Sequence, residues 1–304
     1  MFTSISLALL ASAAAAQATP APQATGNSDQ ILAVQVMLDR ERHSPGVIDG
    51  RNGANTRRAV AAFETANGLG ADGMIDPEVV RLLGERHKEP LLQDHVIAEG
   101  DISGLVTVPT GMEEQSKIES LGYETALEAL AEKFHMSQSL VERLNPGVNL
   151  AVPGTTIRVI KPGANDGAAK VTRIEVDKAM SEVRAIDAEG KLVASYPATI
   201  GSETFPSPSG AMEVRAIAAA PKYYFDPVGR SWGPDERLTI AAGPNNPVGS
   251  TWIDLSKDGY GIHGTPDPQL IGKTASHGCV RLTNWDAQEL SRAVAAGTSV
   301  VFVS

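Results

Sequence analysis

This 304-residue sequence contains one cysteine and few aromatic residues, which make up 5% of the chain. A single cysteine cannot form an intramolecular disulfide, so a disulfide framework is excluded and the thiol of Cys279 needs another explanation. Beyond its first residues the chain has no apolar run long enough to cross a bilayer. The net charge is −10, so the excess of basic residues typical of nucleic-acid binding is also missing.

The first 18 residues predict export. Residues 2–16 are apolar and rich in alanine, and Ala16-Gln17-Ala18 fits a small-x-small cleavage site. The apolar stretch is too short to predict a transmembrane span. We therefore expect a signal peptide at 1–18, followed by a flexible linker at 19–28.

The strongest chemical signal lies in two short runs, YGIHG at residues 260–264 and SHGCVR at residues 276–281. A cysteine is nucleophilic as a thiolate, and a nearby imidazole can remove its proton. His263 and His277 are both candidate bases, and the residues alone leave both geometries open. Gly278 lacks a Cβ, so a substrate carbonyl can approach closely, and amides near Gly278 and Cys279 can hold an oxyanion.

The full run GIHGTxxPxxIGxxxSHGCVR resembles the active-site motif of bacterial L,D-transpeptidases. The resemblance implies acyl transfer through a thioester on Cys279, with His263 as the base. It also implies that the Gly264 carbonyl orients the other ring nitrogen of His263 and that His277 structures the pocket. No metal or organic cofactor is implied, and carbapenems are expected to acylate the cysteine. Arg281 can hold a substrate carboxylate bidentately, with a structural salt bridge as the alternative.

Four further residues are candidates for substrate contact: Ser276, Tyr260, Tyr224 and Trp232. Ser276 is expected to hold a turn through hydrogen bonds, so threonine should be tolerated there. Tyr224 and Trp232 lie within residues 220–250, where aromatic residues occur among prolines and glycines. Long irregular loops are often functional, which favours a lid over the cysteine. A loop with buried aromatic anchors is the alternative.

Two small units precede the motif. Residues 29–86 show three amphipathic helical segments and resemble a peptidoglycan-binding domain, with a plain three-helix bundle as the alternative. Residues 117–161 show a helix–helix–strand pattern and resemble a lysin-motif domain, which binds wall glycan. The opening run of that motif is not intact, because Gly122-Tyr123 stands in its place, so a simple spacer is the alternative. Residues 87–116, with one strand at 105–108, and residues 162–169 are expected to be linkers.

Residues 170–304 alternate apolar and polar residues, which predicts β structure, with a helix after the cysteine and a final strand at 299–303. The resemblance implies a mainly β, sandwich-like catalytic domain with a few helices, behind the small all-α and α+β modules. The whole chain is then expected to be a periplasmic, wall-associated L,D-transpeptidase. It would act on peptidoglycan tetrapeptide stems and form 3→3 cross-links.

Other functions remain as alternatives at this point. An L,D-carboxypeptidase or a lipoprotein-attaching transpeptidase would use the same scaffold with a different acceptor. A non-catalytic peptidoglycan anchor would use only residues 29–161. A zinc site formed by His263, His277 and Cys279 lacks an evident fourth ligand.

Overall fold

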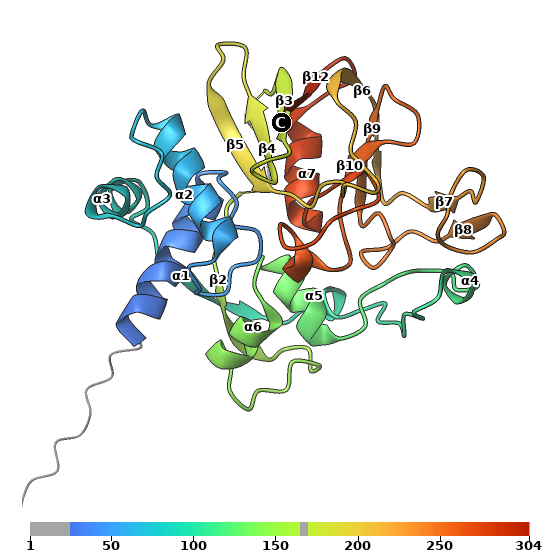
Figure 1. The fold of residues 1–304 in the computed structure, drawn as a ribbon. Helices are drawn as coiled ribbons and strands as arrows, with labels where there is room; N and C mark the ends of the chain where they lie inside the picture. The colour runs from blue at the N-terminus through green and yellow to red at the C-terminus, as the bar shows by residue number, and fades with distance from the viewer. Residues whose placement is uncertain (1–24, 165–169, 304) are drawn as a thin grey trace, which may run out of the picture.

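The computed structural model describes residues 25–164 and 170–303 (Figure 1). The predicted signal peptide at 1–18 and residues 19–24 of the predicted linker lie outside the described residues. Residues 25–28 belong to the first turn of helix α1 (Thr25–Arg40), so the prediction that the linker extends to residue 28 is wrong. The N-terminal unit therefore begins a full turn earlier than its apolar pattern indicated.

Three helices form the N-terminal unit, as the apolar periodicity predicted. Helix α1 packs with α2 (Ala54–Ala66) and α3 (Pro77–Arg86). Asp76 caps α3 by accepting a hydrogen bond of 2.8 Å from Val79 N, and Pro77 occupies the first helical position. The core that the three helices share consists of Val34, Met37, Leu38, Ala59, Val60, Phe63, Val79 and Leu83.

The second unit begins earlier than predicted. Strand β1 (Leu92–Val96) pairs antiparallel with β2 (Thr156–Ile160), and helices α5 (Ala126–Lys133) and α6 (Gln138–Leu144) lie between them in sequence. The predicted strand at 105–108 is irregular, and residues 92–96 are a strand instead of a linker. The sequence LQDHV of β1 is mostly polar, so it shows little apolar–polar alternation. Its partner strand β2 lies about sixty residues further along the chain.

An inserted segment, residues 103–125, separates β1 from α5. It contains the short helix α4 (Met112–Gln115), which contacts strand β8 (Leu238–Ile240) of the C-terminal domain. In Figure 1, α4 lies next to β8 and its partner β7 (Tyr223–Phe225), away from the rest of the second unit. The insertion therefore reaches from the second unit to the C-terminal domain.

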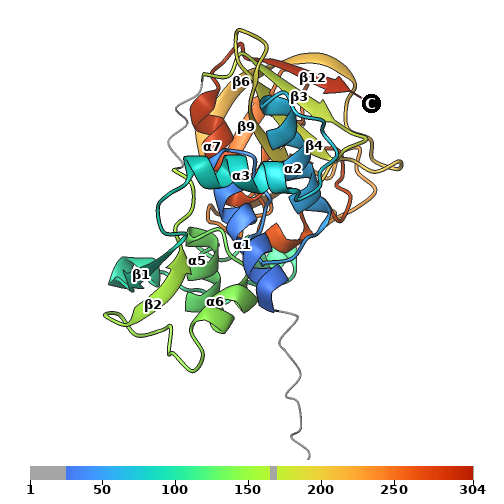
Figure 2. The same cartoon turned by 90° about the vertical axis from the view of Figure 1, so that its left-hand side faces the viewer.

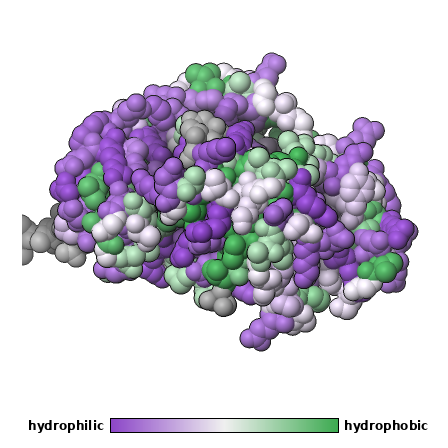
Figure 3. Space-filling view, turned by 90° about the horizontal axis from the view of Figure 1, so that it is seen from above, coloured by the Kyte–Doolittle hydropathy of each residue, from purple (hydrophilic) through white to green (hydrophobic). Residues whose placement is uncertain are grey.

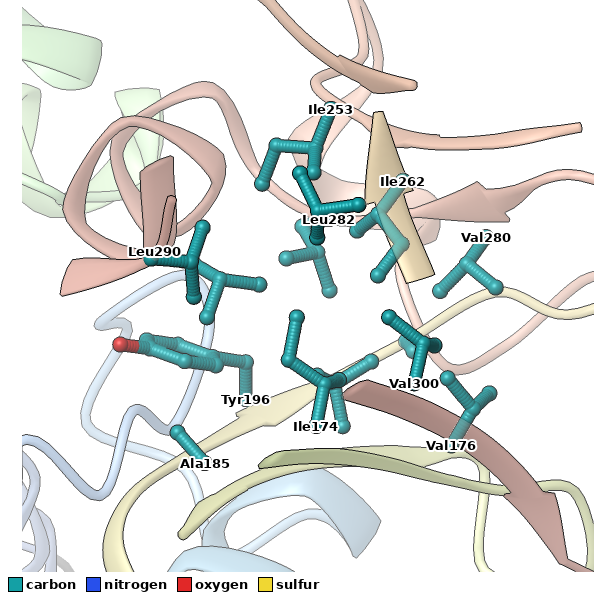
Figure 4. Packing of buried hydrophobic residues seen from close by; sticks show 14 of the residues in the cluster. Ile174, Val176, Ala185, Tyr196, Ile253, Ile262, Val280, Leu282, Leu290 and Val300 are labelled. Carbon is teal, nitrogen blue, oxygen red and sulfur yellow. The ribbon is translucent and has the colours of Figure 1, made fainter. Parts of the chain in front are cut away.

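The C-terminal domain is mainly β with few helices, as predicted. Its eight-stranded sheet has the order β11-β10-β9-β6-β12-β3-β4-β5, and helix α7 (Asn284–Ala293) packs against it. The strands are β3 (Arg173–Asp177), β4 (Glu182–Ile186), β5 (Leu192–Pro197), β6 (Gly210–Ala219), β9 (Thr251–Leu255), β10 (Gly261–His263), β11 (Val280–Arg281) and β12 (Ser299–Val303). Side chains from the sheet and α7 meet in one apolar core, where Ile253, Ile262 and Leu290 converge (Figure 4).

Polar contacts join the three units. The segment after α1 covers the edge strand β5, because Ser44 N donates to Ser195 O at 2.8 Å and Ser195 N donates to Arg42 O at 2.9 Å. The imidazole of His135 lies 3.0 Å from the Asp39 carboxylate and joins the second unit to α1. Residues 162–164, part of the predicted linker, also lie on α1, since Gly163 N donates to Asp39 at 2.7 Å.

Among the helices of the described residues, none combines the length and apolarity needed to cross a bilayer. Hydrophilic residues cover most of the face seen from above, and hydrophobic residues are scattered among them (Figure 3).

Candidate active site

The parallel pair β10–β11 sets the positions of the predicted catalytic residues. Ile262 is in register with Val280, and His263 is in register with Arg281. Both Ile262 and Val280 are fully buried in the core. Because successive side chains of a strand point to opposite faces, His263 and Arg281 share the other face. Cys279 precedes β11 by one residue and therefore lies on the side of Arg281.

This face opens into a cavity of about 620 Å³. The predicted residues that line it are Cys279, His263, His277, Arg281, Tyr224 and Trp232. A second cavity of about 640 Å³ lies between α5, α6 and the loop 266–269, and neither histidine nor cysteine lines it. The thiol, both candidate bases and the predicted carboxylate-binding arginine are thus brought together in the first cavity.

His263 is held as a neutral imidazole with a defined tautomer. Its Nδ1 lies 2.6 Å from the carbonyl oxygen of Gly264, the contact that the resemblance implied. A carbonyl only accepts, so Nδ1 carries the proton and Nε2 keeps its lone pair. Burial, and then the cation of Arg281, lower the pKa of His263 to about 3, although backbone hydrogen bonds at Gly264 and Val248 favour the charged form. The ring is therefore an available base at neutral pH.

Cys279 is a thiol in the resting site. Its Sγ donates to the carbonyl of Gly259 at 3.7 Å. Burial raises the pKa of Cys279, and the Gly261 backbone together with the cations of Arg281 and Arg230 offsets part of that rise. Both the thiol and the imidazole are thus uncharged, so proton removal belongs to the attacking step.

The turn before Cys279 is fixed by serine hydroxyls. Ser207 donates to Gly278 O at 2.7 Å, and Gly278 N donates to Ser276 Oγ at 3.1 Å. The hydroxyl of Ser276 in turn donates to the carbonyl of Cys279. Gly278 has a φ of +113°, and a Cβ there would lie 3.0 Å from the ring of Tyr260. The Gly278 amide, one of the predicted oxyanion donors, donates to Ser276 Oγ in this structure, and its oxyanion role stays a prediction.

Two of the predicted substrate-contact residues lie outside the cavity lining. Ser276 is 3% exposed and uses its hydroxyl within the turn. Tyr260 packs beside Gly278, with the Lys257 ammonium 4.8 Å from its ring centroid. The hydrogen bonds of the Ser276 hydroxyl lie within the turn, as expected for that residue, and the substrate-contact role of Ser276 and Tyr260 stays a prediction.

The stretch 220–250 is an ordered cover. Strands β7 and β8 pair, with Tyr223 opposite Ile240. Trp232 stacks on His277 with ring centroids 4.4 Å apart, while Tyr224 is 70% exposed at the cavity rim. One aromatic residue of this cover is thus anchored on the catalytic turn and another faces solvent.

Comparison with known proteins agrees with this geometry. Residues 171–302 match the family model of the L,D-transpeptidase catalytic domain, and residues 27–83 match a model described as "Putative peptidoglycan binding domain". The relative named "Putative L,D-transpeptidase YkuD" of Bacillus licheniformis is 30% identical over 174 residues, which cover 57% of this chain and 91% of that protein. This chain belongs to the L,D-transpeptidase family. It is therefore an enzyme of the acyltransferase type.

Other similarities are more local. "Probable L,D-transpeptidase YbiS" of Escherichia coli strain K12 is 40% identical over 74 residues, 24% of each chain. The solved structure of an L,D-transpeptidase from Mycobacterium smegmatis matches with 18% identity and a TM-score of 0.37, covering 50% of this chain and 64% of that one.

Several lining residues of this L,D-transpeptidase were not predicted. Trp252 stacks on the ring of His263 at 5.4 Å between centroids, and the alternation of buried Ile253 and Leu255 in β9 would have placed it on the cavity face. Met112 lines the cavity from the inserted segment, for which no pattern in the sequence gives a signal. Among the described residues, no group of three or more His, Cys, Asp or Glu could hold a metal ion.

Replacing Ser276 by alanine should loosen the catalytic turn. The change removes the acceptor of the Gly278 N–H and a donor to the Cys279 carbonyl, which costs about 1–3 kcal/mol of unfolding free energy when a buried donor is left unpaired. Denaturant unfolding measures the loss of stability, and the acyl-transfer rate of the same variant measures how far the loosened turn impairs catalysis. Ser276→Thr keeps the hydroxyl and should behave as wild type; equal losses in the two variants would contradict this account.

The alkylation rate of Cys279 should rise steeply with pH. Because burial raises its pKa, the thiolate fraction at neutral pH is below that of a free cysteine, whose pKa is about 8.5. Iodoacetamide should therefore react slowly near neutral pH. The rate should keep rising with pH beyond the pKa of a free cysteine. Mass spectrometry of the alkylated protein over a pH series measures the rate. A plateau below about pH 7 would instead indicate a thiolate–imidazolium pair.

Proposed function

We propose that this enzyme cleaves the bond between diaminopimelate and the terminal D-alanine of a peptidoglycan tetrapeptide stem and transfers the acyl group to an amine of a neighbouring stem. The product is a 3→3 cross-link. The observation that carries the proposal is that Cys279 and His263 line one cavity, with the Gly264 carbonyl fixing the tautomer that leaves His263 Nε2 unprotonated. The match of residues 27–83 to a peptidoglycan-binding model supports the choice of polymer.

The first half-reaction forms a thioester. His263 Nε2 takes the thiol proton as Cys279 Sγ attacks the scissile carbonyl, and the N–H of Cys279 stabilises the oxyanion. The carbon–nitrogen bond then breaks, and the same imidazole returns the proton to the amine of the leaving D-alanine. The guanidinium of Arg281 holds a stem carboxylate during these steps. Its Nε is buried without a hydrogen-bond partner among the described residues, which fits a group that awaits an anion.

The second half-reaction restores the enzyme. An acceptor amine attacks the thioester, and His263 accepts the amine proton. The carbon–sulfur bond breaks as the amide forms, and the imidazole returns a proton to the Cys279 sulfur. No redox change occurs in either step, and no cofactor is required. Carbapenems would enter the same path, because the thiol opens the strained lactam and remains acylated.

We further propose that the chain acts outside the cytoplasmic membrane, on the cell wall. The apolar residues 2–16 support export, and the peptidoglycan-binding match supports wall association. A fusion of residues 1–24 to a reporter that is active only after export would test this placement.

Purified protein incubated with disaccharide-tetrapeptide muropeptides tests the reaction. Dimers that lack one D-alanine are the expected products by mass spectrometry. Tripeptide monomers alone would mean that water is the acceptor and that the enzyme is a carboxypeptidase. No product from folded protein that still binds peptidoglycan would support a wall-binding role without catalysis.

A further inference from the structure

The active-site cavity is positively charged on an acidic protein. Lys222, Arg230 and Arg281 line it, and no aspartate or glutamate does. The whole chain carries a net charge of −10, so this local excess runs against the overall balance. Clefts that are lined by charges of one sign and have low-dielectric walls raise the local concentration of ligands of the opposite charge. The lining therefore indicates a substrate with more than one negative charge near the scissile bond.

Arg230 is held in place without being neutralised. Its guanidinium lies over the rings of Trp232, at 5.1 Å, and Phe225, at 5.7 Å. Its Nε donates to the backbone carbonyl of Asp226 at 2.9 Å. The carboxylate of Asp226 pairs instead with Arg237, 3.0 Å away. Among the described residues, the ion pairs leave Arg230 and Arg281 without a carboxylate partner.

The two arginines that line the cavity come from different elements. Arg281 follows Cys279 by two residues on the same face, about 7 Å along a strand. Arg230 belongs to the cover between β7 and β8, and its contact with Trp232 places it beside His277. A tetrapeptide stem has one carboxylate on the leaving D-alanine, and on the donor side it has one at the far end of the diaminopimelate side chain and one on the preceding γ-linked glutamate.

We propose that Arg230 binds the side-chain carboxylate of diaminopimelate, while Arg281 binds the carboxylate of the terminal D-alanine, so that donors with a free diaminopimelate carboxylate are selected over amidated ones. This assignment rests on the proposed function and specifies its donor. A guanidinium forms two parallel charge-assisted hydrogen bonds to a carboxylate, which a neutral carboxamide cannot match. Arg230 is then the residue that determines donor specificity.

A pair of donor tetrapeptides that differ only by amidation of the diaminopimelate side chain provides the test. Their dissociation constants are measured by calorimetry on the full chain carrying Cys279→Ala, which prevents turnover, with and without Arg230→Gln. Arg230→Lys is the conservative variant. The double variant Asp226→Asn, Arg237→Gln is the matched control, because it removes an ion pair of the same cover that does not line the cavity and leaves no released carboxylate beside Arg230. The ratio kcat/KM for the two donors is measured in parallel with Cys279 intact.

The free donor should bind roughly 10-fold more tightly than the amidated donor, as expected for one charge-assisted contact. Arg230→Gln should remove that difference by weakening the free donor alone, Arg230→Lys should keep part of it, and the double variant Asp226→Asn, Arg237→Gln should keep all of it. Because the Arg230 cation also lowers the pKa of Cys279, Arg230→Gln can slow both donors equally, and the ratio cancels that effect.

Equal binding of the two donors, or a preference that survives Arg230→Gln, would overturn the assignment. Failure of the proposed function gives a different result: the wild type turns over neither donor, whatever the dissociation constants show. Binding and turnover therefore separate the two hypotheses.

Discussion

Replacing Cys279 with alanine should abolish acyl transfer while leaving the protein folded and able to bind peptidoglycan. The thiol is the proposed covalent nucleophile, and no other cysteine exists in the chain to replace it. We expect the rate of cross-link formation to fall by at least roughly 10³-fold, about 4 kcal/mol of transition-state stabilisation. Muropeptide products quantified by mass spectrometry against time measure this loss.

The binding of the same variant to insoluble peptidoglycan serves as its control. The N-terminal unit matches the peptidoglycan-binding model and lies outside the C-terminal domain, so sedimentation with wall sacculi should be unchanged. A folded Cys279→Ala protein that cross-links at the wild-type rate would exclude the thioester route. Loss of wall binding together with loss of catalysis would point to misfolding, which thermal unfolding would detect.

Replacing His263 with alanine should have the second largest effect. The neutral ring is the proposed acceptor of the thiol proton, and the removal of a general base typically costs about 10²–10⁴-fold in rate. The variant should regain activity as the pH rises, because a thiol with a raised pKa then ionises without a base. Rates measured over a pH series give both the loss of activity and its recovery. The substrate must be stable to hydroxide over that pH range.

His277→Ala is the matched comparison for His263→Ala. His277 lines the same cavity, but its ring stacks on Trp232 and contacts Phe205 at a tilt instead of being fixed by a carbonyl. Burial lowers the pKa of His277, so it is also neutral at physiological pH. We expect its replacement to cost less than about 10-fold, since it removes packing on the turn and not the base. The opposite ranking of the two variants would assign the base to His277.

The predictions succeeded where residues close in sequence determine the structure. The run 276–281 contains its own turn, and the alternation of residues within β10 and β11 sets which side chains share a face. The helix after the cysteine was predicted from its cap, and Thr283 does cap α7 by accepting a hydrogen bond of 3.1 Å from Asp286 N. Local rules of capping and alternation therefore sufficed to place Cys279, His263 and Arg281 on one face, while the choice of His263 as the base came from the family resemblance and stays a prediction.

The predictions failed where distant segments meet. Strand β1 carries a weak alternation of its own and is defined by its pairing with β2. Met112 reaches the cavity through an insertion whose position depends on contact with β8. The charges of the cover give another example, since only the pairing of β7 with β8 places Arg230 in the cavity while Arg237 remains outside. The alternation and capping patterns of one segment contain no information on which distant segment it will pair with.

The thioester itself is the most direct test of the central claim. Full-length protein is mixed with a tetrapeptide donor in the absence of an amine acceptor, quenched in acid within its first turnovers and analysed as the intact protein. The account predicts a covalent adduct whose mass equals that of the donor less D-alanine, located on Cys279 by peptide mapping, labile to hydroxylamine and absent from Cys279→Ala. Release of D-alanine by wild-type protein without any adduct on Cys279 under these conditions, or an adduct on another residue, would contradict it.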